Sequence, residues 1–135
     1  MPGGSVITDL DVGDVLWYSF THPGGAFAVD TLGSTLGPDN DSELFLYNNL
    51  GTLVAANDDI SASNFLSTIT LGSLAAGNYF LAAGGFDTSG GAGFSVTSAS
   101  TLAGNIQING LTVVPEPGGV ILALFGGLLA APRRR

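Results

Sequence analysis

Short runs in which apolar and polar side chains alternate recur along this 135-residue chain. The runs stand at residues 15–20, 27–31, 43–47, 52–56, 65–71, 78–83, 94–97 and 105–109. An alternation with a period of two predicts strands, and the Gly, Asn, Asp and Ser residues between the runs predict tight turns. Because no stretch before residue 118 sustains a helical period, we expect an all-β fold. Its expected architecture is an antiparallel, jelly-roll-like β-sandwich of about eight strands.

Two of the expected strands are predicted to form a hairpin. The run at 43–47 is apolar on both faces, which is typical of a central strand in a sandwich. The turn residues 48–51 connect it to the run at 52–56. Two glycine-rich stretches, 84–85 and 90–93, do not match a phosphate-binding loop, since the chain has no lysine. We expect these stretches to be flexible hairpin loops.

The charged residues are distributed very unevenly along the chain. Eleven residues are Asp or Glu, whereas the only basic side chains are Arg133, Arg134 and Arg135, which gives a net charge of −8. A protein that binds nucleic acid by neutralising phosphates needs Lys and Arg spread over a face, so this class is excluded. Carboxylates that cluster in the first 132 residues must lie in solvent, accept hydrogen bonds from backbone N–H groups, or bind a cation.

Acidic residues flank the predicted hairpin at the end away from its turn. Asp39 and Asp41 precede the first strand together with Glu43, and Asp58 and Asp59 follow the second. Pairing through the 48–51 turn would place Asp41 opposite Asp59. Calcium suits such a set of oxygen ligands, so we expect a calcium site formed by Asp39, Asp41, Asp58 and Asp59. The alternative is a pair of solvated, Asx-rich loops that cap the strand ends.

The C-terminal residues 114–135 have a different composition. Pro115, Glu116 and Pro117 precede an uncharged apolar stretch at 118–131, and the arginines follow it. As a helix this stretch would be about 21 Å long, against roughly 30 Å for a bilayer core. Its apolar faces and basic end favour a membrane helix with a cytoplasmic Arg end, although a buried helix or a frayed tail is the alternative. We therefore divide the chain into a β-sandwich domain, 1–113, and a tail, 114–135.

The order of these three tail features resembles the PEP-CTERM sorting signal. The resemblance implies that an exosortase, a membrane transpeptidase, acts near the Pro-Glu-Pro motif after the tail has anchored the exported protein transiently. The expected destination is the cell surface or extracellular matrix. Residues 1–5 show neither a basic nor an apolar signal region, so we expect a reading frame that starts further upstream.

Three segments of the first domain are similar to bacterial pre-peptidase C-terminal-like domains. They are residues 13–20, 41–59 and 74–81, in that order. The resemblance implies a jelly-roll-like sandwich that serves secreted bacterial proteins as an accessory domain and often binds calcium.

The sequence offers little for catalysis. His22 is the only histidine, it precedes an apparent turn, and we expect it at the surface. No GxSxG motif marks a nucleophilic serine, so we expect a protein that is not an enzyme.

Three functions remain open. The first is a non-catalytic exported surface or matrix protein, stabilised by calcium and sorted by its tail. The second is a carbohydrate-binding module for an exopolysaccharide, with Trp17, Tyr47 or Tyr79 as stacking platforms and Trp17 as the most exposed. The third is the C-terminal accessory fragment of a larger secreted hydrolase, whose catalytic part would precede Met1.

Overall fold

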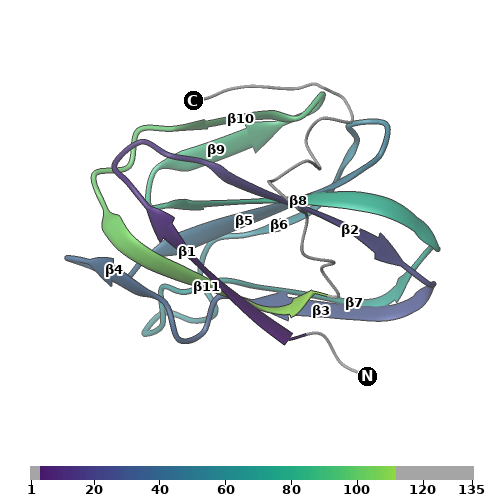
Figure 1. Cartoon of the computed structure of the whole chain (residues 1–135), viewed down its shortest axis with the longest axis horizontal. Coiled ribbons are helices and arrows are strands. Elements are labelled where there is room, and N and C mark those ends of the chain that lie inside the picture. Colours follow the sequence, from purple (N-terminus) through teal and green to yellow (C-terminus); the bar gives the residue numbers. More distant parts are fainter. Residues whose placement is uncertain (1–3, 112–135) are drawn as a thin grey trace.

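The computed structural model describes residues 4–111, which form eleven strands and no helix. Figure 1 shows two stacked sheets with a further hairpin against one of them. No helix within this part of the chain is long and apolar enough to span a membrane. The expected membrane helix at 118–131 lies outside the described residues.

All strand pairs are antiparallel, as expected for this sequence. One sheet has the order β1-β11-β3-β7 with β4 beside β11, a second has the order β2-β8-β5-β6, and β9 pairs with β10. The strands are β1 (Gly4–Leu10), β2 (Leu16–His22), β3 (Gly25–Asp30), β4 (Thr35–Gly37), β5 (Ser42–Asn48), β6 (Leu53–Asn57), β7 (Thr68–Leu74), β8 (Gly77–Gly85), β9 (Thr88–Gly91), β10 (Ser95–Ser98) and β11 (Ala103–Leu111). The expectation of an all-β, sandwich-like fold is confirmed.

The main core lies between the two large sheets. Alternate side chains of the strands point into it, so Leu44 and Leu46 of β5 and Ile106 and Ile108 of β11 belong to one core cluster, and all four are fully buried. Burial of this apolar surface is the main force that holds the sheets together.

A second apolar cluster covers the opposite face of β5. Phe45 and Tyr47 point away from the main core and pack with Trp17, Phe80 and Val96. The β9–β10 hairpin contributes Val96 and so covers this face (Figure 1). Since β5 also pairs with β6 on one side and β8 on the other, it is the central strand that its sequence predicts.

Four of the five glycines expected in flexible loops belong instead to strands. Gly84 and Gly85 end β8, whereas Gly90 and Gly91 end β9. A Cβ atom on Gly90 would lie 2.6 Å from Cδ2 of Phe45, so only glycine permits β9 to approach the second cluster this closely. The expectation of a loop is therefore wrong for Gly84, Gly85, Gly90 and Gly91, whereas Gly93 lies in the turn of the β9–β10 hairpin, as expected.

The structure contains more strands than the eight expected. In β1, Leu10 is buried but Ile7, on the other face, is 64% exposed. Because apolar residues occur on both faces, the sequence of β1 does not alternate between apolar and polar residues. The strands β4 and β9 are short and contain few apolar residues. The expected strand at 65–71 begins later, as β7, because residues 58–67 form a loop, in which Phe65 is 42% exposed.

Truncation of β5 provides a test of this packing. Leu46→Ala removes a fully buried side chain and is expected to lower the free energy of unfolding by about 2–5 kcal/mol. The matched variant Leu50→Ala alters a side chain that is 83% exposed and should change it by less than about 0.5 kcal/mol. Urea unfolding followed by tryptophan fluorescence measures both, and equal losses would contradict the proposed core.

Candidate metal centre

The acidic residues lie at the open end of the β5–β6 hairpin. Its turn is the predicted one, since Gly51 donates its N–H to the carbonyl of Asn48 over 3.1 Å. The register places Leu44 opposite Asn57, one residue away from the expected pairing, because a bulge interrupts the ladder between Leu46 and Tyr47. The chain therefore enters β5 through Asp41 and leaves β6 at Asp58, as the sequence predicts.

The loop after β6 folds back on itself and returns the chain to β5. The N–H of Thr68 donates to Oδ1 of Asn57 over 3.0 Å, which closes the base of the loop. Ile60 donates its N–H to the carbonyl of Leu66 over 2.7 Å, and Ser42 donates its N–H to the carbonyl of Phe65 over 3.0 Å. These bonds hold the two acidic segments beside one another.

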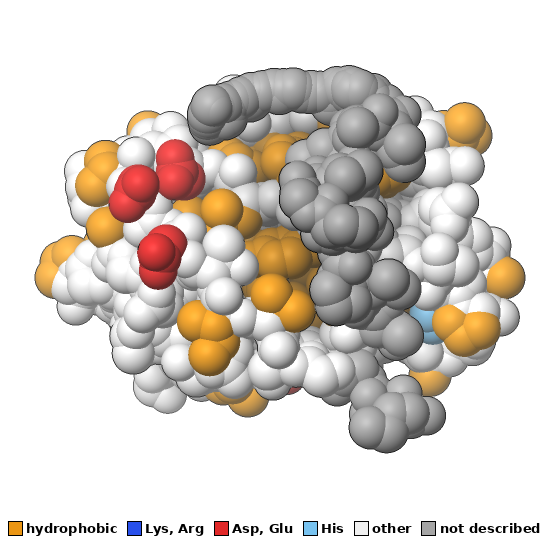
Figure 2. Space-filling model, viewed as in Figure 1, with side chains coloured by type: hydrophobic (Ala, Val, Ile, Leu, Met, Phe, Trp, Pro, Cys, Tyr) orange, Lys and Arg blue, Asp and Glu red, His pale blue; other side chains and the backbone are white. Residues whose placement is uncertain are grey.

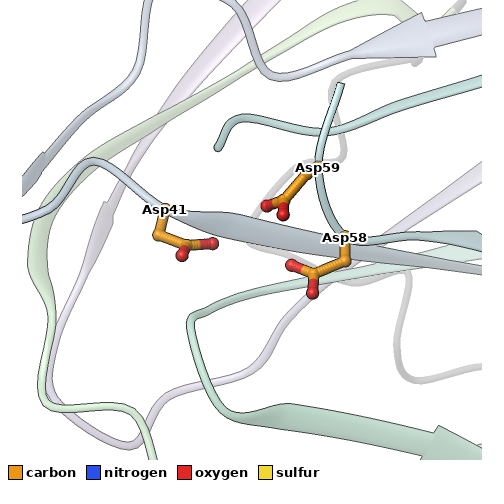
Figure 3. Close-up of side chains that lie close together, drawn as sticks. All are labelled: Asp41, Asp58 and Asp59. Carbon is orange, nitrogen blue, oxygen red and sulfur yellow. The ribbon is translucent and has the colours of Figure 1, made fainter. Parts of the chain in front are cut away.

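Three carboxylates meet at this point. One oxygen atom from each of Asp41, Asp58 and Asp59 lies within 4.8 Å of the other two. Figure 3 shows the three carboxylates pointing toward one another, Asp41 from the start of β5 and the others from the segment after β6. Asp58 and Asp59 are exposed, whereas Asp41 is only partly so.

One oxygen atom of the cluster lacks a partner. Oδ1 of Asp41 is shielded from solvent and has no hydrogen-bond partner among the described residues. A buried carboxylate oxygen of this kind costs free energy unless a proton or a cation satisfies it.

The remaining acidic residues of the expected cluster lie around this group. Glu43, half-buried, accepts a hydrogen bond at Oε2 from the N–H of Asp87 over 3.1 Å. Asp39 is exposed and lies outside the three-carboxylate group, although its charge acts on Asp41. Three of the four candidate ligands are thus brought together. Glu43 belongs to the acidic run of the sequence but is not among the expected ligands. The hairpin register could have identified it as a neighbour of the site, since it stands almost opposite Asp58.

The electrostatics of the site disfavour its ionised form. Burial, followed by repulsion from Asp58, Asp59 and Asp39, raises the pKa of Asp41 to about 6. Burial and the charge of Asp58 raise the pKa of Glu43 to about 7, although the hydrogen bonds that Glu43 accepts from backbone N–H groups act to lower it. Burial, and then Asp59, also raises the pKa of Asp58. Residues 4–111 contain no Lys or Arg to relieve this repulsion.

The donor set fits calcium. Calcium binds six to eight oxygen ligands at about 2.3–2.6 Å, so two ligands on opposite sides of one ion are roughly 5 Å apart. The 4.8 Å limit on the three carboxylate oxygens allows them to share one ion. In Figure 2 the acidic side chains of the viewed face lie over the end of β1 and the loop that follows it, and residues 4–111 contain no Lys or Arg that could pair with these or with the three carboxylates.

The aromatic side chains considered as sugar platforms are engaged in packing. Tyr47 and Tyr79 are buried, and Trp17 is half-buried with its ring centroid 5.7 Å from that of Tyr47 and 6.1 Å from that of Phe94. Trp17 is the most exposed of the three, as expected, but it is half-buried because the segment that carries Phe94 packs against its ring.

The expectation of a surface histidine is also wrong. His22 is 9% exposed and packs edge-on against Phe27 and Tyr79. Its Nε2 lies 3.1 Å from the carbonyl oxygen of Gly25, so the ring is held within the turn between β2 and β3.

Comparison of the chain with models of known protein families and with curated proteins finds no match to either. The candidate site therefore rests on its own geometry.

The raised pKa values predict how stability depends on pH without calcium. Asp41 and Glu43 bind protons more tightly in the folded than in the unfolded state, so the free energy of unfolding falls as pH rises from about 4 to about 7. In Glu43→Gln this fall is smaller, because one of the titrating groups is absent. Urea unfolding in calcium-free buffer across this pH range measures the slope.

Asp9→Asn provides the matched control, since it removes one negative charge from an exposed position on β1. It should leave the slope close to that of the unsubstituted chain. A slope unaffected by Glu43→Gln would contradict the assignment of this pH dependence to the acidic cluster.

Proposed function

We propose that this protein is a non-catalytic, exported surface or extracellular-matrix protein. Its β-sandwich binds calcium at Asp41, Asp58 and Asp59, with Asp39 as an outer acidic residue. An exosortase recognises the tail and cleaves near Pro115, Glu116 and Pro117. The observation that carries the calcium assignment is the shielded, unpartnered Oδ1 of Asp41 beside two other carboxylates.

The proposal includes a jelly-roll arrangement of the sandwich. If β4 and the β9–β10 hairpin are set aside, eight antiparallel strands remain. When these eight are numbered along the chain, their order is 1-8-3-6 in one sheet and 2-7-4-5 in the other. This order supports a jelly roll, in which two Greek keys wrap one core. The same fold is the one implied by the resemblance to pre-peptidase C-terminal-like domains.

The tail supports the proposed destination through its sequence alone. The Pro-Glu-Pro motif, the apolar stretch at 118–131 and the terminal arginines occur in the order of a PEP-CTERM signal. In the proposal, Arg133, Arg134 and Arg135 stay on the cytoplasmic side until cleavage releases the sandwich.

Calcium is expected to stabilise the folded chain. An ion that binds only the native state adds about 2.7 kcal/mol when its free concentration is a hundred times Kd. This corresponds to a rise in Tm of at least about 5 °C. The double variant Asp41→Asn with Asp59→Asn should lose this rise, while its Tm in chelator should not fall, because charge repulsion is reduced.

Thermal unfolding of the full chain by circular dichroism, with calcium and with chelator, measures these shifts. Asp9→Asn with Asp11→Asn makes the same change of charge at two exposed positions and should retain the calcium response. An equal loss of Tm with and without calcium in the Asp41/Asp59 variant would contradict the calcium site.

The tail has a test of its own. In cells that contain an exosortase, the chain should be shortened at its C-terminus, whereas replacement of Pro115, Glu116 and Pro117 by alanine should leave it uncleaved and membrane-bound. Mass spectrometry of the released and membrane fractions distinguishes the two. Pro23→Ala, which lies outside the tail sequence, serves as the control and should be processed normally.

A further inference from the structure

Three buried hydroxyl groups lie directly behind the candidate metal centre. Thr31, Ser42 and Ser67 have no exposed surface, although they are polar. Oγ1 of Thr31 is 2.7 Å from Oγ of Ser42, which is 2.9 Å from Oγ of Ser67. These residues come from three separate segments, the ends of β3 and of the 58–67 loop and the start of β5.

Ser67 joins the two acidic segments through its hydroxyl group. Its Oγ lies 2.6 Å from the carbonyl oxygen of Ser42, the neighbour of Asp41, and 2.8 Å from the carbonyl oxygen of Asp58. A single hydroxyl thus bridges the backbone of the two segments that carry the three carboxylates.

The other two hydroxyls fix the orientation of this bridge. The N–H of Ser67 donates to Oγ1 of Thr31 over 2.9 Å, and the N–H of Thr31 donates to the carbonyl of Ser67 over 3.0 Å. With these bonds in place, the Thr31 hydroxyl can donate to Ser42, and the Ser42 hydroxyl to Ser67. The proton of Ser67 is then directed at the two carbonyl oxygens, and every hydroxyl of the group has a partner.

We infer that Ser67 is a positioning residue of the metal centre, which holds Asp41 and Asp58 at ligand distance before any cation binds. This inference rests on the proposed calcium site. Three carboxylates without a basic partner repel one another, and an unrestrained loop would move Asp58 and Asp59 away from Asp41. The buried hydroxyl bridge opposes that movement, so the cation meets a preformed set of ligands.

The consequence is a loss of calcium affinity when the bridge is removed. Ser67→Ala deletes the bridging oxygen without changing any proposed ligand, and its Kd for calcium is expected to rise at least about tenfold, as for other residues that orient metal ligands. Isothermal titration of the full, calcium-free chain with calcium chloride measures Kd at a temperature where circular dichroism shows the chain to be folded.

Ser100→Ala is the matched control. Ser100 is also a buried serine whose Oγ accepts a hydrogen bond, from the N–H of Leu102 over 3.1 Å, but it makes no hydrogen bond to the acidic segments. Its removal should lower stability to a similar degree and leave Kd unchanged, which separates positioning from a general loss of stability.

A second pair of variants serves if Ser67→Ala does not fold. Thr31→Val keeps the shape of the side chain but removes the hydroxyl that fixes Ser67, and should weaken calcium binding. Thr31→Ser retains the hydroxyl and should restore Kd to near that of the unsubstituted chain.

The outcomes are distinct. Weaker binding by Ser67→Ala or Thr31→Val, with normal binding by Ser100→Ala and Thr31→Ser, supports the inference. Calcium binding by Ser67→Ala with an unchanged Kd overturns the positioning role and leaves the calcium site intact. If the unsubstituted chain binds no calcium, the proposed site and the role of Ser67 both fail.

Discussion

The arrangement of the molecule depends on one strand, β5, which is apolar on both faces. Leu44 and Leu46 require cover from the opposite sheet, and Phe45 and Tyr47 require separate cover on the other side. No single sheet can supply both, so the chain adds the β9–β10 hairpin above the second face. Burial on both faces, with β6 and β8 as neighbours, fixes β5 in place along with the acidic residue that precedes it.

The three carboxylates of the candidate metal centre cost free energy in an otherwise well-packed structure. Three acidic side chains converge where the described residues offer no Lys or Arg, and the pKa of Asp41 rises to about 6 in response. Native proteins retain such local costs where a ligand or a function compensates them. The buried hydroxyls of Ser42 and Ser67 keep the group together from behind, in a region that solvent does not reach.

The sequence predicts those features that depend on local patterns. The alternating runs identify eight of the strands, and the turn at 48–51 with its flanking acidic residues leads to Asp41, Asp58 and Asp59. Features that depend on contacts between distant residues are not predictable in this way. The glycines of β9 are strand residues because Phe45 packs against Gly90, and nothing in the local sequence around Ser67 indicates its bonds to Thr31 and Ser42.

The position of the two ends of the sandwich determines how it would respond to tension. Gly4 of β1 lies opposite Leu111 of β11, so the described part of the chain begins and ends at the same corner of one sheet. A force that pulled these ends apart would separate β1 from β11 one residue pair at a time, starting at that corner, which requires far less force than sliding whole strands past each other. The strand β5 belongs to the other sheet, so the acidic centre would stay assembled while the first strand peeled away.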